Sequence, residues 1–395
     1  MEVSSVAVVG AGTMGASIAV ALASHGYDVI LKEVNDELLE KGLENLQRIN
    51  SRREAKGADP ELIARELERI KPTTSYESFT EVDLVVEAVP EKLEIKEKVF
   101  KDLDDYCNVN AILATNTSSL SISQIGAFTM RPDKVIGLHF FNPAHLMKLV
   151  EVIPGLETSE DTVNTCLNLG QSLNKLAVRV EECPSFLVNR LLGRYMNESL
   201  WCLYEGLAGI EEIDTKASEF VVPIGPLALR DMNGADIGLA VCNFNYQEYG
   251  PRFEAPDILE KMVERNLLGR KTGKGFYLYD EKTRKRAGAN PEIEDLLSKN
   301  SGKVKKIDFR VEQLFLPMIN EAFLALQERI CNPQELDPAL MAGLGMRKGP
   351  LALANEIGLA DCLKMLEQNF ELYGERFRPA PLLKRFVHAK KVFLI

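Results

Sequence analysis

Short apolar runs alternate with segments of helical composition through the first part of the chain. A β-rich run at 3–9 leads into an alanine-rich segment that ends near residue 23, and a second apolar run covers 27–31. Further apolar runs lie at 82–89, 111–115, 135–140 and 146–150. Near-continuous apolar runs are expected of parallel strands that helices cover on both faces. This alternation predicts an α/β domain built on a doubly wound parallel sheet.

A glycine-rich turn, G-A-G-T-M-G, follows the first predicted strand. Gly10, Gly12 and Gly15 open the predicted helix, and Glu33 follows the next apolar run, 18 positions beyond Gly15. Such glycines let the backbone approach a pyrophosphate, which the N–H groups of the helix N-terminus then bind. Glu33 would accept hydrogen bonds from ribose hydroxyls and repel a 2′-phosphate, so the pattern favours NAD over NADP. The alternative is a glycine turn that binds no nucleotide.

A locally basic segment follows this turn. Residues 35–70 read as two helices broken near 57–60, and the first carries basic side chains toward its end. These are Arg48, Arg52, Arg53 and Lys56. They form either a solvated helix face or an arm that meets a phosphorylated ligand.

The stretch 138–151, L-H-F-F-N-P-A-H-L-M-K-L-V-E, combines an imidazole with a carboxylate. His139 lies among apolar residues at a strand end, and a second apolar run leads to Glu151, twelve residues further on. A carboxylate behind an imidazole fixes the tautomer and favours the charged form, which makes a general base near neutral pH. The alternative is a buried structural histidine beside an unrelated surface glutamate.

A polar cluster, N-T-S-S-L at 116–120, follows the strand predicted at 111–115. Ligands of open α/β sheets gather at the carboxyl edge of the strands. His139 should reach the same edge, so we expect Ser118 to lie near it. A serine with no base in its own motif is expected to act as a hydrogen-bonding group and not as a nucleophile.

The second half of the chain is predicted to be helical and internally repeated. Asn197-Glu198 recurs as Asn320-Glu321, 123 positions later. Four other pairs keep nearly the same offset: I-D with L-D, G-P-L with G-P-L, I-G-L with I-G-L, and Y-G-P-R-F with Y-G-E-R-F. We therefore expect an α/β domain at 1–182, a first helical domain at 183–280 and a second, degenerate copy at 307–395. A polar linker, 280–306, would separate the copies. Since G-R-K-T-G-K-G-F-Y follows only the first copy, the second is interpreted as a packing partner.

Composition narrows the class of protein. The 395 residues are 46% hydrophobic and 27% charged, with a net charge of −11, which argues against nucleic-acid and anionic-membrane roles. The cysteines (107, 166, 183, 202, 242, 331, 362) show no metal-like spacing, so free thiols and no metal site are expected. A strand begins almost at once and no apolar run approaches about 20 residues, so neither a signal peptide nor a membrane span is expected. The cytoplasm is the expected compartment.

The chain resembles the L-3-hydroxyacyl-CoA dehydrogenase family almost from end to end. The motifs that carry the resemblance fall in family order: G-A-G-T-M-G, V-V-E-A-V-P-E, N-T-S-S-L, G-L-H-F-F-N-P, M-K-L-V-E-V-I, C-P-S-F-L-V-N-R and G-R-K-T-G-K-G-F-Y. The resemblance implies that His139 is the general base and Glu151 its partner. It also implies that Ser118 and Asn189 contact the reacting end of the substrate. Cofactor contacts are implied for Gly10, Gly12, Gly15, Glu33, Glu91, Lys96 and Asn142.

The resemblance further implies the reaction and its partners. An NAD-dependent, reversible oxidation of (S)-3-hydroxyacyl-CoA to 3-ketoacyl-CoA is expected, on short-chain substrates such as 3-hydroxybutyryl-CoA. Arg53 and Lys56 would touch the CoA moiety. The paired helical copies would form a pseudo-dimer within one chain, which would itself be a monomer or a homodimer. Two alternatives stay open: a dehydrogenase of a free hydroxy acid such as a sugar acid, and a non-catalytic relative of the lens-crystallin kind.

Overall fold

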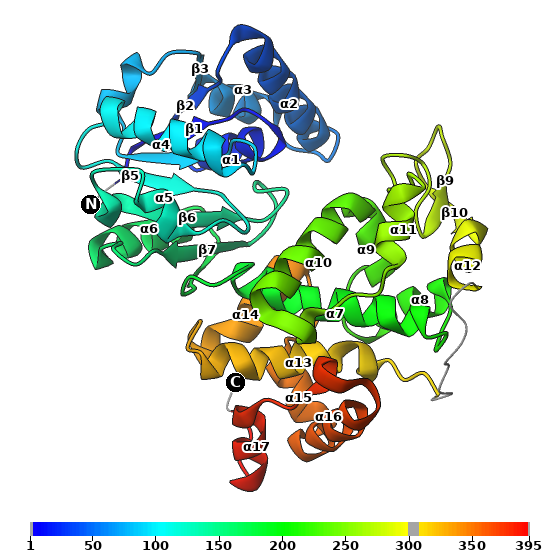
Figure 1. Cartoon of the computed structure of the whole chain (residues 1–395). Helices are drawn as coiled ribbons and strands as arrows, with labels where there is room; N and C mark the ends of the chain where they lie inside the picture. The colour runs from blue at the N-terminus through cyan, green and yellow to red at the C-terminus, as the bar shows by residue number, and fades with distance from the viewer. Residues whose placement is uncertain (1–2, 299–307, 394–395) are drawn as a thin grey trace. The chain divides into compact units, whose positions relative to one another are not determined.

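The chain forms two compact units, 1–186 and 187–395, each with its own core. The computed structural model describes residues 3–298 and 308–393 (Figure 1).

A single sheet organises the first unit. Its eight strands, in the described part of the chain, follow the order β3-β2-β1-β4-β5-β6-β7-β8. They are β1 (Ser5–Val9), β2 (Asp28–Lys32), β3 (Ile70–Thr73), β4 (Leu84–Glu87), β5 (Ile112–Thr115), β6 (Val135–Phe140), β7 (Leu149–Pro154) and β8 (Leu176–Arg179). Every neighbouring pair is parallel except β6 and β7. The predicted doubly wound sheet is confirmed.

Helices cover both faces of this sheet (Figure 1). They are α1 (Thr13–Ala23), α2 (Asp36–Glu54), α3 (Pro60–Glu68), α4 (Leu93–Tyr106), α5 (Ile122–Gly126) and α6 (Glu160–Ser172). Because successive strand side chains point to opposite faces, Val6 and Val8 belong to the core under α1 and α6, whereas Ala7 and Val9 belong to the core under α4 and α5. Strands buried on both faces read as continuous apolar runs, which is why the sequence revealed them.

The basic segment forms a pair of helices, α2 and α3. Asn35 caps α2 by accepting a hydrogen bond from the Leu38 N–H, and Asp59 caps α3 ahead of a proline at its first turn. An ion pair of 2.7 Å joins Arg53 of α2 to Glu66 of α3, with both side chains mostly buried. The predicted break near 57–60 is confirmed.

The second unit is helical, as predicted. Its elements are α7 (Phe186–Tyr204), α8 (Ile210–Phe220), α9 (Pro226–Asn233), α10 (Ala235–Tyr249), α11 (Ile258–Glu264), β9 (Tyr277–Tyr279), β10 (Arg286–Ala289), α12 (Pro291–Ser298), α13 (Glu312–Gln327), α14 (Pro333–Leu344), α15 (Pro350–Ile357), α16 (Leu359–Tyr373) and α17 (Pro381–His388). The segment expected to be a plain linker carries β10 and α12 before residue 299, and its remainder, 299–306, lies outside the described residues.

Two buried aspartates make the same contacts at equivalent places in this unit. Asp214 accepts hydrogen bonds from the N–H groups of Leu227 and Ala228 at the start of α9. Asp337 does the same for the corresponding residues at the start of α15. Each carboxylate satisfies N–H groups that the first turn of a helix leaves without partners. The shared contacts explain why the aspartates and the two G-P-L motifs recur together in the sequence.

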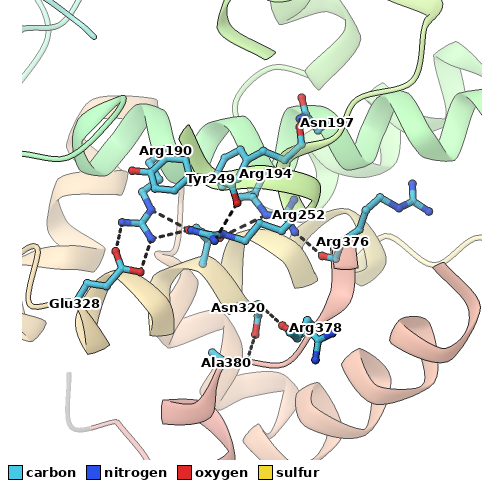
Figure 2. Close-up of polar contacts among 12 residues, drawn as sticks. Arg190, Arg194, Asn197, Tyr249, Arg252, Asn320, Glu328, Arg376, Arg378 and Ala380 are labelled. Atoms are coloured by element: carbon cyan, nitrogen blue, oxygen red, sulfur yellow. Dashed lines mark hydrogen bonds and ion pairs between the residues drawn. The ribbon is translucent and has the colours of Figure 1, made fainter. Parts of the chain in front are cut away.

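Charged side chains meet between α7 and α13. Glu321 of α13 is fully buried and forms ion pairs with Arg190 at 2.7 Å and Arg252 at 3.3 Å. Arg190 also pairs with Glu328 at 2.6 Å, and Figure 2 shows Arg190, Arg194 and Arg252 gathered at this point. A buried carboxylate of this kind is retained only where cations compensate the cost of removing it from water.

Candidate active site

His139 and Glu151 lie opposite each other on neighbouring strands. β6 and β7 pair antiparallel with His139 in register with Glu151, so both side chains point to the same face of the sheet. His139 Nδ1 lies 2.7 Å from Glu151 Oε2, and the side chains are 5% and 0% exposed. The aromatic ring of Phe141 packs against the imidazole, with centroids 4.6 Å apart. The carboxylate therefore engages Nδ1, and Nε2 is the ring nitrogen on the side away from Glu151.

The Ser118 hydroxyl lies next to His139 Nε2. Its Oγ lies 3.2 Å from His139 Nε2. It follows β5, whose carboxyl end is beside that of β6 in the sheet. The main-chain N–H of Ser118 donates to Glu91 Oε1 at 3.0 Å, which fixes the turn that carries the hydroxyl. The structure thus brings together three residues that the sequence placed at one sheet edge.

Glu91 organises the turn after β5. It accepts hydrogen bonds from Thr117 Oγ1 and Ser119 Oγ, and lies 3.3 Å from Lys96 Nζ. Burial alone would raise the pKa of Glu91, but the Lys96 ammonium and the hydroxyl and N–H donors outweigh it and lower that pKa. Glu91 is therefore a carboxylate at neutral pH, fixed next to the predicted cofactor loop.

Lys96 is held in the interior by a second carboxylate. Its Nζ donates to both oxygens of Glu87, at 2.7 and 2.9 Å, and Thr115 Oγ1 donates to the same carboxylate. Sequence reasoning did not single out Glu87 or Thr115. Both could have been noticed in the sequence, because each is a polar residue at the end of an otherwise apolar strand. A buried charge such as that of Glu87 requires a partner.

The glycine-rich turn has the geometry that a dinucleotide requires. Gly10 has φ +98°, and a Cβ there would lie 2.7 Å from the Ala88 carbonyl oxygen. A Cβ on Gly15 would lie 1.7 Å from the Gly10 oxygen, so the helix can pack this closely only with glycine. A Cβ on Gly12 would have no described protein atom within 4 Å, and no described side chain caps the N-terminus of α1. That open, uncapped helix end fits a pyrophosphate.

Glu33 lies beside this turn. Its Oε1 accepts a hydrogen bond from the Ala11 N–H at 2.6 Å, and its Oε2 accepts from the Val34 N–H at 3.1 Å. The carboxylate therefore stands next to the glycine turn at the carboxyl end of β2, where a ribose would need it. The uncapped N-terminus of α1 and the Glu33 carboxylate together fit NAD.

Asn142 begins a loop that reaches back to α1. It is exposed, and its peptide bond to Pro143 is cis. Three residues later, His145 Nδ1 lies 2.8 Å from Ser17 Oγ of α1. This loop and the end of α2, including Arg53 and Lys56, line a common cavity. Neither Ser17 nor His145 had been identified from sequence, and no motif marked their pairing.

Asn189 belongs to the second unit. It lies in the first turns of α7 and is half-buried. Its proposed contact with substrate stays a prediction.

This combination of features defines a class of protein. A glycine turn that fits a dinucleotide and an imidazole–carboxylate pair lie at the carboxyl edge of one sheet. Such a site can take a proton from an alcohol while a bound dinucleotide accepts a hydride. The class is that of NAD-dependent dehydrogenases that act on hydroxyl groups.

Comparison with known proteins gives the family. Residues 5–183 match the model of the 3-hydroxyacyl-CoA dehydrogenase NAD binding domain. Residues 186–279 and again 309–393 match that of the 3-hydroxyacyl-CoA dehydrogenase C-terminal domain. The chain belongs to the 3-hydroxyacyl-CoA dehydrogenase family. The predicted resemblance and the NAD cofactor are confirmed.

Individual relatives cover the chain to different extents. The 3-hydroxybutyryl-CoA dehydrogenase of Clostridioides difficile is 46% identical over 279 residues, which are 70% of this chain and 99% of that protein. The fatty acid oxidation complex subunit alpha of Shewanella amazonensis is 35% identical over 99% of this chain, but the chain spans only 56% of that subunit. The crystal structure of 3-hydroxybutyryl-CoA dehydrogenase from Escherichia coli K12 covers 98% of this chain, and the chain covers 99% of it, with a TM-score of 0.87 and 32% identity.

Two searches of the described residues were negative. No helix among them is long and apolar enough to cross a bilayer. Within the same residues, no group of three or more histidine, cysteine, aspartate or glutamate side chains is arranged to hold a metal ion.

Proposed function

We propose that the chain catalyses the reversible, NAD-dependent oxidation of short-chain (S)-3-hydroxyacyl-CoA to 3-ketoacyl-CoA. The observation that carries this proposal is the His139–Glu151 pair, whose Nδ1–Oε2 contact of 2.7 Å leaves Nε2 beside Ser118. The family supports the reaction type, and the names of two relatives, both 3-hydroxybutyryl-CoA dehydrogenases, support a short acyl chain.

The mechanism assigns the proton to His139. NAD, when bound, would supply the acceptor for the hydride from C3 of the substrate. His139 Nε2 takes the proton of the C3 hydroxyl as the carbonyl forms, and the Glu151 carboxylate stabilises the resulting imidazolium. General base catalysis of this kind contributes on the order of 10²–10⁴-fold. In the reverse direction the same nitrogen returns the proton to the ketone oxygen.

Ser118 and Asn189 are proposed to orient the substrate. The Ser118 hydroxyl, 3.2 Å from Nε2, lies where the reacting oxygen must be held. The Asn189 amide would bind the carbonyl of the same substrate. Donors that are fixed before the reaction stabilise charge that develops on oxygen, and such stabilisation can match the contribution of the base.

Gly10, Gly12, Gly15, Glu33, Glu91, Lys96 and Asn142 are proposed as the cofactor site. The open space at Gly12 and the uncapped end of α1 support the pyrophosphate position. Glu91 and Lys96 would act from the turn after β5. The Lys96 ammonium is already held by Glu87, so its role is to fix Glu91.

Arg53 and Lys56 are proposed to meet the CoA moiety. Both line the cavity between α2 and the loop that begins at Asn142. Arg53 is partly neutralised by Glu66. Lys56 is exposed and has no carboxylate partner among the described residues, so it is the better candidate for a phosphate contact.

The two helical copies, with limits near 183–280 and 307–395, are proposed to form a pseudo-dimer inside one chain. The support is a pair of reciprocal contacts: Arg252 lies 3.3 Å from Glu321, and the equivalent Arg376 lies 3.9 Å from the equivalent Glu198. Reciprocal contacts of this kind characterise a two-fold interface. The assembled chain would then be a monomer or a homodimer, in the cytoplasm.

A substrate series tests the proposed function. NADH oxidation is followed at 340 nm with acetoacetyl-CoA, free acetoacetate and a long-chain 3-ketoacyl-CoA. We expect turnover of acetoacetyl-CoA and none of free acetoacetate. Preference for the long chain would contradict the short-chain assignment, and turnover of the free acid alone would show a hydroxy-acid dehydrogenase. If all three substrates are inert while NADH binds, the proposed reaction is wrong.

A further inference from the structure

A basic cavity lies in the first unit between α1, the end of α2 and the loop 142–146. Its volume is about 200 Å³. No carboxylate is among its described lining residues, although the whole chain has a net charge of −11. Its lining includes Ser17, Arg48, Arg52, Arg53, Lys56 and His145. An acidic protein that gathers cations around one cavity provides a site for an anion.

Three of these cations are uncompensated. Arg53 is engaged by Glu66 and by the Asn50 side-chain oxygen. In contrast, within residues 3–298 and 308–393, no carboxylate lies within ion-pair distance of Arg48, Arg52 or Lys56. Two guanidinium groups and an ammonium favour a ligand of multiple negative charge, and a phosphate monoester or a diphosphate has that charge.

His145 is fixed at the wall of this cavity. Its Nδ1 lies 2.8 Å from Ser17 Oγ, and its main-chain N–H donates to the same oxygen at 3.2 Å. Ser17 is itself buried, with 1% of its surface exposed, so the contact is built into the fold. Since Nδ1 is engaged by Ser17, Nε2 is the ring nitrogen that a ligand can reach.

The surroundings of His145 favour its neutral imidazole. Burial lowers the pKa of His145, and the positive charges of Arg53, Lys175 and Lys56 lower it further. Arg53 lies in the last turn of α2 and Lys56 two residues beyond that helix, and Lys175 directly precedes β8. Helix α1 contributes the neutral Ser17. All three of these charged groups are cations. An anion in this cavity would oppose their effect on the pKa of His145.

We propose that His145, held by Ser17, is a phosphate-binding residue that takes up a proton from solvent when a phosphate-bearing ligand enters this cavity. The protonated ring donates from Nδ1–H to Ser17 Oγ and from Nε2–H to a phosphate oxygen. One source of that phosphate is acyl-CoA, and this assignment rests on the proposed function. The dinucleotide is a second source of the same phosphate chemistry. His145 would thereby add a fourth positive charge to the three uncompensated cations only when the ligand is present.

Calorimetry with adenosine 3′,5′-bisphosphate tests the proposal. The bisphosphate is titrated into the full chain at pH 7.5 in two buffers of different ionisation enthalpy, which gives the protons taken up on binding. We expect His145→Gln to abolish the net uptake shown by wild type and to weaken binding about tenfold, as loss of one charge-assisted hydrogen bond does. His25→Gln, which alters an exposed histidine at the end of α1, is the matched control and should keep full uptake.

Additional measurements separate the outcomes. The chain has four histidines, so ¹⁵N spectra of the imidazoles can follow His145 directly, and Ser17→Ala provides a second variant if His145→Gln unfolds. Uptake that depends on His145 with NADH instead of the bisphosphate would support the residue and assign the phosphate to the cofactor. Equal uptake in wild type and His145→Gln, with both ligands, would overturn the proposal. Failure of wild type to reduce acetoacetyl-CoA would refute the proposed reaction without changing these results.

Discussion

Glu151 orients the His139 imidazole through its contact with Nδ1, and its carboxylate would stabilise an imidazolium. The two residues face each other because they occupy register positions of adjacent strands, and both are almost completely buried. A buried carboxylate at this distance stabilises an imidazolium far more than one in water would. This geometry supports the proposed role of His139, in which Nε2 takes the proton.

Replacement of Glu151 by glutamine tests that arrangement. The amide keeps the shape and a hydrogen bond to Nδ1 but removes the charge, so kcat for acetoacetyl-CoA should fall about 10²–10⁴-fold. NADH affinity, measured by fluorescence titration, should stay within about twofold. The exposed Glu157→Gln is the matched control and should be unaffected. A kcat near that of wild type in Glu151→Gln would remove Glu151 from the mechanism.

Glu33 is expected to set the choice between NAD and NADP. Glu33→Gln retains an oxygen for the Ala11 N–H, which Glu33 now binds at 2.6 Å, and removes the charge that would repel a 2′-phosphate. The ratio of kcat/KM for NAD to that for NADP should fall about tenfold, the equivalent of about 1.4 kcal/mol. Steady-state kinetics with both cofactors measure it, and Glu37→Gln on the exposed face of α2 is the control. An unchanged ratio would exclude Glu33 from the ribose site.

At the scale of secondary-structure elements, the basic end of α2 is the part of the chain proposed to contact CoA. Lys56→Ala should raise KM for acetoacetyl-CoA about 3- to 10-fold, because a charge-assisted contact to phosphate is lost. KM for NADH should be unchanged. Lys41→Ala, also near α2's exposed surface but paired with Glu37 at 2.7 Å, should leave both values as they are. If Lys41→Ala and Lys56→Ala behave alike, the Lys56 contact does not exist.

Helix α7 carries a carboxylate whose burial makes the second unit sensitive to pH. Burial raises the pKa of Glu198 to about 7, despite the opposing charge of Arg376. The unfolded chain releases this proton near pH 4.5. Between those values the folded state binds more protons than the unfolded state does, so stability falls as pH rises from about 5 to about 7.

Unfolding by urea at several pH values tests this sensitivity. The only tryptophan of the chain, Trp201, lies on α7 under the Arg376 guanidinium, so its fluorescence reports this unit. Glu198 should contribute a decrease of at most about 3 kcal/mol to the free energy of unfolding across that range. The decrease should be smaller in Glu198→Gln than in wild type, with a remainder from Asp231, whose pKa burial raises to about 6. The exposed Glu212→Gln should keep the wild-type decrease. A slope that is the same in Glu198→Gln and wild type would contradict the assignment.

At the scale of the whole molecule, the sequence predicted features that are local or periodic. The parallel strands appear as apolar runs because both faces of the sheet are covered, and the glycine turn is marked by its own spacing. His139 and Glu151 could be paired from sequence because an out-and-back path joins them over twelve residues. Ser118 could be placed near them because neighbouring parallel strands end at one edge.

Contacts between distant segments could not be predicted in this way. Strand β3 contains Pro72 and few apolar residues, so it is defined by pairing with β2 and not by its own composition. The Ser17–His145 contact joins residues 128 positions apart and depends on how the 142–146 loop folds back on α1. The charge on Glu198 likewise depends on burial that only the packed helical unit creates.

The most direct measurement mixes the enzyme–NADH complex with acetoacetyl-CoA and follows absorbance at 340 nm through a single turnover. In wild type, NADH should be consumed as one equivalent of 3-hydroxybutyryl-CoA forms. His139→Gln should retain NADH binding and the fold, and in this variant consumption should slow by about 10²–10⁴-fold. Stable absorbance with the wild-type complex, or equal rates in wild type and His139→Gln, would contradict the central claim that His139 moves the proton in a 3-hydroxyacyl-CoA dehydrogenase reaction.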